Sequence, residues 1–172
     1  NQKIDIDFSI IRKMPINFNI DSVRWYFHVT GAHANLNEPY IFVDPHKNIK
    51  NKVVIMRNTR RKSYITNYKF LKSYKDLLFI GLEYEYRDLK KEVPNLEFYD
   101  CNDFLEVAEI IKASKFFLGN ASFGFTIAEG LKVPRLLESV PEFPLIYPNG
   151  INAYDFYFQV HFEKLFDDLY NL

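Results

Sequence analysis

The most constraining feature of this chain is the stretch from Lys115 to Glu138, which reads KFFLGNASFGFTIAEGLKVPRLLE. Its first part is a continuous apolar run, Phe116 to Leu118, typical of a parallel strand buried on both faces. A polar turn follows, in which Ser122 is suited to cap a helix. The stretch therefore predicts a strand, a helix and a second strand in direct succession.

The turn before this helix has two interpretations. The free N–H groups at the start of the helix would point into the crevice at the carboxyl end of the strand, where open α/β sheets bind phosphate-bearing ligands. The same residues also suit a strand–helix–strand unit that binds nothing. Turn chemistry alone does not separate these alternatives.

Strand and helix patterns alternate from about residue 52 onward. Apolar runs predict strands at 52–56, 77–82, 96–99, 115–118 and 135–137. Helical patterns lie between them, at 68–74, 83–92, from 103 onward and at 123–132. Such alternation implies parallel pairing and right-handed crossovers. We therefore predict an α/β fold, a Rossmann-like parallel sheet of about five strands with helices on both faces.

The two ends of the chain differ from this pattern. Residues 1–50 form an expected N-terminal extension or interdomain segment, and residues 51–172 the Rossmann-like domain. Within the extension, Ile4, Ile6 and Phe8 alternate with polar residues, and 23–30 favours a helix, capped by Asp21 or Ser22, over a strand. At the other end, a C-terminal helix is expected to run from Asn152 to Leu172. The start at Asn1 fits a complete chain and a piece of a longer protein equally well.

Composition excludes several function classes. Basic and acidic residues both number 22, so the net charge is zero, whereas nucleic-acid binding normally needs a basic excess. The four histidines have no metal-ligand spacing, and no apolar run is long enough for a transmembrane segment. The single cysteine, Cys101, excludes an internal disulfide and suggests a reducing compartment, so we expect a cytoplasmic location.

The residues from Asp103 to Glu138 resemble the C-terminal half of GT-B glycosyltransferases, and most closely the heptosyltransferase-like family. Asn120-Ala121-Ser122, then Ala128, Gly130-Leu131 and Val133-Pro134, are similar to the family's turn, helix and following strand. The likeness extends more weakly over residues 52–172. It implies a metal-independent transferase domain that needs no cofactor, because the nucleotide-sugar donor is itself the substrate. It also implies a second Rossmann-like domain, which could instead be supplied by a homo-oligomer.

The chain departs from this family at two points. Ala121 stands where the family carries an acidic residue, and the helix after it lacks the family's histidine. The general-base carboxylate of such enzymes lies in an N-terminal domain, so no catalytic residue is assigned here. Two hypotheses follow: a glycosyltransferase domain that transfers a sugar together with a partner domain, or a non-catalytic binding module that keeps the half-fold.

If a nucleotide sugar binds, its diphosphate requires cations and N–H donors, and its ribose requires acceptors. The candidates for substrate binding are Arg57, Arg60, Glu83, Asn120, Ser122, Phe123, Gly124 and Glu129. Arg57, nearest the end of the first strand, is the favoured phosphate ligand, and Glu83 follows the second strand as a ribose acceptor. Each also has an ordinary role, as a solvated loop charge, a cap or a turn residue. Gly124 permits close approach of either a ligand or the neighbouring strand.

Overall fold

The computed structural model describes residues 22–142 and 146–172. Its centre is one sheet of six parallel strands in the order β3-β2-β1-β4-β5-β6. The strands are β1 (Val53–Met56), β2 (Leu77–Ile80), β3 (Glu97–Tyr99), β4 (Phe116–Asn120), β5 (Arg135–Glu138) and β6 (Ala153–Phe156). This is the strand order of a Rossmann-like α/β fold, so the predicted fold class is confirmed.

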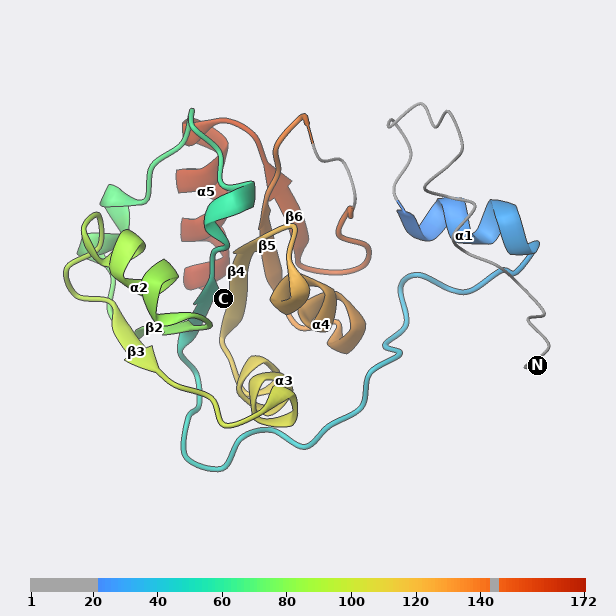
Figure 1. The fold of residues 1–172 in the computed structure, drawn as a ribbon, viewed down its shortest axis with the longest axis horizontal. Coiled ribbons are helices and arrows are strands. Elements are labelled where there is room, and N and C mark those ends of the chain that lie inside the picture. Colours follow the sequence, from blue (N-terminus) through green and yellow to red (C-terminus); the bar gives the residue numbers. More distant parts are fainter. Residues whose placement is uncertain (1–21, 143–145) are drawn as a thin grey trace.

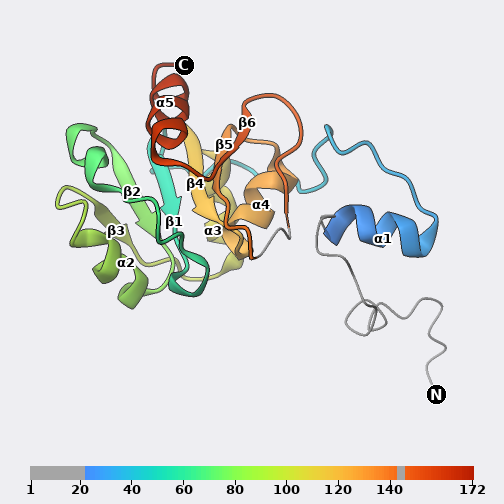
Figure 2. The same ribbon diagram turned by 90° about the horizontal axis from the view of Figure 1, so that it is seen from above.

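Helices cover both faces of the sheet (Figures 1 and 2). The covering helices are α2 (Glu83–Lys90), α3 (Phe104–Lys112), α4 (Phe123–Leu131) and α5 (Gln159–Tyr170), with the short 3-10 helices η2 (Thr59–Arg61) and η3 (Lys69–Ser73) in the loops after β1. A further helix, α1 (Ser22–Thr30), precedes them in the chain. One apolar cluster joins alternate strand residues to α2, η3 and α5, and the other joins the intervening strand residues to α3 and α4. Because strand side chains alternate between faces, each apolar run supplies both cores.

Two elements differ from the prediction. The segment 68–74 forms the 3-10 helix η3 rather than an α-helix. The sixth strand, β6, is not among the predicted strands: its four residues, AYDF, lie where the sequence predicts the start of the C-terminal helix, which begins only at Gln159. These residues form a strand because they pair with β5 in the sheet. Their own short, partly polar sequence does not predict a strand.

The helix predicted at 23–30 is confirmed as α1, which runs from Ser22 to Thr30. Gly31 ends it in a left-handed conformation (φ 69°), and its N–H donates to the carbonyl of Phe27 at 2.8 Å. Figures 1 and 2 show α1 standing apart from the layers around the sheet. The expected alternation at Ile4, Ile6 and Phe8, and the possible cap Asp21, lie outside the described residues.

The segment that leads from α1 to β1 runs along the C-terminal ends of α4 and α3. The N–H groups of Tyr40 and Ile41 donate to the carbonyl of Gly130 at 2.9 and 3.0 Å. The backbone N–H of His46 donates to the backbone carbonyl of Glu109 at 2.9 Å. A Cβ on Gly130 would lie 2.5 Å from the Ile41 side chain. The absence of a side chain at Gly130 therefore lets this segment satisfy helix carbonyls that would otherwise need water.

Candidate functional site

A cavity lies where the strand order reverses, between the carboxyl ends of β1 and β4. Its volume is about 800 Å³, within the range of small-molecule sites. The loops after β1, β2, β3 and β4 all contribute to its wall. The lining residues that bear on its chemistry are Asn58, Arg60, Arg61, Glu85, Asp100, Cys101, Asn102, Asp103, Phe104, Ser122 and Phe123.

Three helices begin near this cavity, and only the start of α4 lacks an acidic side chain. Asp103 caps α3, since its carboxylate accepts the N–H of Glu106 at 2.8 Å, and the first turn of α2 contains Glu83 and Glu85. The first turn of α4 has no acidic residue. Of these three helix starts, α4 is therefore the one suited to an anion.

Ser122 lies at the N-cap position of α4 but does not cap the helix. Its side chain makes no capping hydrogen bond, and its buried Oγ has no hydrogen-bond partner within the described part of the chain. A buried hydroxyl without a partner is uncommon and needs an explanation. Because Ser122 lines the cavity, a ligand that accepts or donates a hydrogen bond there would supply one.

Two glycines allow α4 to begin this close to β1. A Cβ on Gly119 would lie 2.6 Å from the backbone carbonyl oxygen of Met56, and one on Gly124 would lie 2.5 Å from the Met56 Sδ. Both distances are far below an ordinary contact. Of the two roles predicted for Gly124, the structure shows the approach of the neighbouring strand, and Gly124 itself does not line the cavity.

The basic wall of the cavity comes from η2, which carries Arg60 and Arg61. The side chain of Asn58 starts this turn by accepting the N–H of Arg60 at 2.8 Å. Asn120, the last residue of β4, holds the backbone of Asn58 from both sides: its Nδ2 donates to the carbonyl at 2.7 Å, and its Oδ1 accepts the N–H at 3.0 Å. Asn120 therefore fixes the arginine-bearing turn rather than lining the cavity.

Arg57, the favoured phosphate ligand in the sequence, lies behind this wall. Its side chain is 5 % exposed, and its Nε and Nη2 donate to Glu138 at 2.8 and 2.6 Å. Burial by itself lowers the pKa of Arg57, but the hydrogen bond and charge of Glu138 outweigh it and raise the pKa above its usual value. The guanidinium stays charged and is paired with Glu138. Arg57 does not line the cavity.

The acidic residue that faces the cavity after β2 is Glu85. Glu83 is exposed and forms an ion pair with Arg87 at 2.6 Å, whereas Glu85 is 4 % exposed and lines the cavity. Burial raises the pKa of Glu85, although hydrogen bonds from the backbone of Thr59 and Leu82 partly offset this. The spacing of Glu85 and Leu89, four residues apart on the buried side of α2, was the available signal in the sequence.

Two exposed aromatic rings stand at the mouth of the cavity. Phe104 and Phe123, the first residues of α3 and α4, are 74 % and 50 % exposed, and their ring centroids are 4.7 Å apart. Nearby Cys101 is no nucleophile at neutral pH, because burial and the charges of three carboxylates raise the pKa of its thiol to about 12. The rings of Phe104 and Phe123 form the apolar part of this end of the cavity.

Glu129 lies away from the cavity, inside a buried ionic cluster at the start of β5. The Nε of Arg135 donates to its carboxylate at 2.6 Å, and Lys132 also pairs with it. Of the eight predicted binding residues, Arg60, Ser122 and Phe123 line the cavity. The other five, Arg57, Glu83, Asn120, Gly124 and Glu129, do not.

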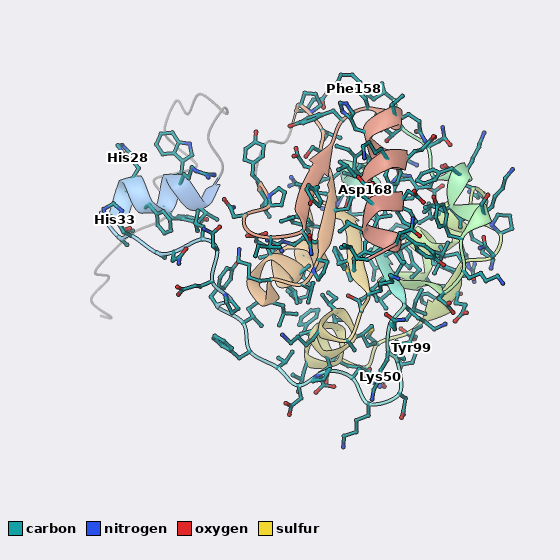
Figure 3. All side chains as sticks on the ribbon, turned by 180° about the vertical axis from the view of Figure 1, so that it is seen from behind. His28, His33, Lys50, Tyr99, Phe158 and Asp168 are labelled. Carbon is teal, nitrogen blue, oxygen red and sulfur yellow. The ribbon has the colours of Figure 1, made fainter. Side chains whose placement is uncertain are left out.

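No candidate metal centre accompanies the cavity. Among residues 22–142 and 146–172, no group of three or more histidine, cysteine or acidic side chains is placed to hold a metal ion. Figure 3 shows His28 and His33 at the α1 end of the molecule, well apart from the sheet. The helices in the described ranges are all too short or too polar to cross a membrane.

Comparison of the chain with models of known protein families and with curated protein sequences gave no match. Fold and site thus define the class of protein directly, a Rossmann-like α/β domain with a cavity at its switch point.

Proposed function

We propose that this chain is the nucleotide-sugar-binding domain of a GT-B-type glycosyltransferase. The observation that carries the proposal is the start of α4: a helix N-terminus without acidic residues in its first turn, opening into a large cavity that two arginines also line. Backbone N–H groups and guanidinium groups on one cavity are suited to a diphosphate. The sequence resemblance of residues 103–138 to such enzymes supports the same assignment.

The lining residues supply complementary groups for each part of a nucleotide. The start of α4 and Arg60 suit the diphosphate. Glu85 is a buried carboxyl group whose pKa is raised by burial. Its oxygens are suited to accept hydrogen bonds from the hydroxyl groups of the ribose. Phe104 and Phe123 offer apolar ring faces on which a base stacks, an interaction worth about 1–3 kcal/mol per base in nucleic-acid complexes.

Sugar transfer by this domain would need no metal ion. The bond that breaks leaves a negatively charged diphosphate, and fixed N–H dipoles and arginines stabilise such charge without rearranging. The acceptor and the general base would come from elsewhere, since the resemblance assigns them to a second domain.

The surface around the cavity fits the presence of a partner. Large apolar side chains are exposed in the loops or first helical turns that follow β1, β2, β3, β4 and β6, namely Tyr64, Ile65, Leu82, Tyr84, Phe104, Leu105, Phe123 and Phe158. Figure 3 shows how far this edge extends, with Tyr99 at the end of β3 and Phe158 just after β6 on opposite sides of the body. An apolar rim of this kind marks an interaction site, either for a second Rossmann-like domain or for another copy of the chain.

Isothermal titration calorimetry with ADP, UDP, GDP and CDP tests the binding proposal. We expect one of them to bind, and Arg60→Ala to weaken it by about three- to ten-fold, as for loss of a partly exposed charged hydrogen bond. Arg87→Ala is the matched control, because Arg87 pairs with Glu83 on α2 and does not line the cavity. Absence of binding at millimolar concentration by the folded protein would refute the proposal. Binding without transfer, once a partner domain is supplied, would favour the non-catalytic module.

A further inference from the structure

One buried carboxylate, that of Glu138, accepts hydrogen bonds from several residues of the loop that follows β1. Glu138, the last residue of β5, has no exposed surface. Besides the two nitrogens of Arg57, it accepts the N–H of Ser63 at 2.8 Å, the hydroxyl of Tyr68 at 3.1 Å and that of Thr66 at 3.5 Å. The ring of Tyr68 also lies under the Arg57 guanidinium, 4.2 Å from its centroid. Four residues of one loop thus depend on one acceptor.

The residues bound by Glu138 flank the two arginines of the cavity. Arg57 precedes η2, and Ser63 follows it closely, so Arg60 and Arg61 lie on the short stretch between two anchored points. Asn120 holds a third point at Asn58. Glu138 itself does not line the cavity. Its influence on a ligand would therefore pass through the backbone of this loop.

We propose that Glu138 is a positioning residue for the phosphate end of the cavity. It holds the loop from Arg57 to Thr66 so that Arg60 and Arg61 face the start of α4 before any ligand arrives. Preorganised groups bind more tightly because the ordering cost is met during folding. This inference rests on the proposed nucleotide binding and adds a residue that makes no contact with the ligand.

Two variants test this role, with a third as control. Glu138→Gln keeps the size of the side chain and removes its charge, but leaves Arg57 without its carboxylate partner, which can destabilise a fold severely. Tyr68→Phe removes one hydroxyl donor and keeps the ring beneath Arg57, so it serves if the first variant does not fold. Arg135→Met is the matched control, since it breaks the other buried ion pair of β5, with Glu129, away from the cavity.

The measurements are calorimetric affinities for ADP, UDP, GDP, CDP and their nucleosides, with hydrogen exchange of the amides from 58 to 66. We expect Glu138→Gln to weaken diphosphate binding about ten-fold or more and Tyr68→Phe about two- to ten-fold. Nucleoside affinity should change little, and exchange in the loop should accelerate. Arg135→Met should leave the ratio of diphosphate to nucleoside affinity unchanged.

Different failures have different meanings. If the unmodified protein binds none of the diphosphates, the proposed function is refuted and this inference falls with it. If it binds one of them and the folded Glu138 or Tyr68 variants bind equally well, only the positioning role is refuted. An equal loss of diphosphate and nucleoside affinity, matched by Arg135→Met, would show a general effect on stability and would also overturn the inference.

Discussion

Gly119 provides a direct test of how tightly β1 and β4 must approach to form the cavity. An alanine Cβ at this position would lie 2.6 Å from the carbonyl oxygen of Met56 and 2.7 Å from the Cε1 of Phe117. The carbonyl belongs to the backbone of a central strand, paired on both sides, and cannot rotate away. The variant Gly119→Ala must therefore displace one of the two strands.

The expected cost follows from two opposing contributions. Overpacking of a tight core costs about 1–3 kcal/mol, whereas the lower conformational entropy of an unfolded chain with alanine returns only about 0.4–1 kcal/mol. Because a strand carbonyl yields less than a side chain, we place Gly119→Ala in the upper part of this range. The net loss in the free energy of unfolding should be about 1–2.5 kcal/mol, or a fall in Tm of about 2–10 °C for a domain of this size.

Urea denaturation followed by circular dichroism measures this change, with Gly124→Ala as the comparison. At Gly124 the Cβ would meet the Sδ of Met56 at 2.5 Å, and this side chain can move into the cavity. Alanine also favours the helix by up to about 1 kcal/mol. We therefore expect a smaller loss of stability at 124 than at 119. A Gly119→Ala protein as stable as the unmodified one would refute the close approach of β1 and β4.

Three further predictions concern cavity residues. The raised pKa of Glu85 means that its folded form holds its proton more tightly, so the stability of the unmodified protein relative to Glu85→Gln should fall as pH rises through and above the ordinary carboxyl value of about 4.3; urea titrations from pH 4 to 8 that give a constant difference would contradict this. Ser122→Ala should leave stability nearly unchanged, unlike the loss of about 1 kcal/mol at a working N-cap, while weakening nucleotide binding; equal losses in both, by denaturation and calorimetry, would refute it. Cys101 should react slowly with a thiol reagent at pH 7, because its pKa is about 12, and a rate equal to that of free cysteine would show an accessible thiolate.

Much of the sheet could be predicted because its signals are local. Apolar runs such as VVIM and LLFI, each buried throughout, mark β1 and β2 without reference to the rest of the chain. The capping of α3 by Asp103 is equally local, since donor and acceptor are three residues apart. The strand β6 forms because it pairs with β5, and its four residues, AYDF, show no pattern that predicts a strand.

The site was only partly predictable because several of its partners are distant in sequence. Arg57 and Glu138 are 81 positions apart, and nothing near Arg57 shows that its guanidinium already has a partner. Asn120 and Asn58, 62 positions apart, pose the same problem. For Glu85 the sequence does contain a signal, since its spacing from Leu89 places it on the buried side of α2. Glu83 comes earlier after the strand, but its helical position leaves it exposed.

These outcomes share one physical cause, the geometry at the end of a parallel strand. Neighbouring strands lie about 5 Å apart, so a polar side chain at or just after a strand's last residue meets the ends of adjacent strands before it meets solvent. Arg57, Asn120 and Glu138 occupy such positions, are almost fully buried, and are used to fix the loops. Arg60 and Ser122 lie further along the loops and line the cavity. In a sheet of this kind, residues that line a cavity at the strand ends are therefore best sought just beyond the strand, and the polar residues at its end are best interpreted as their support.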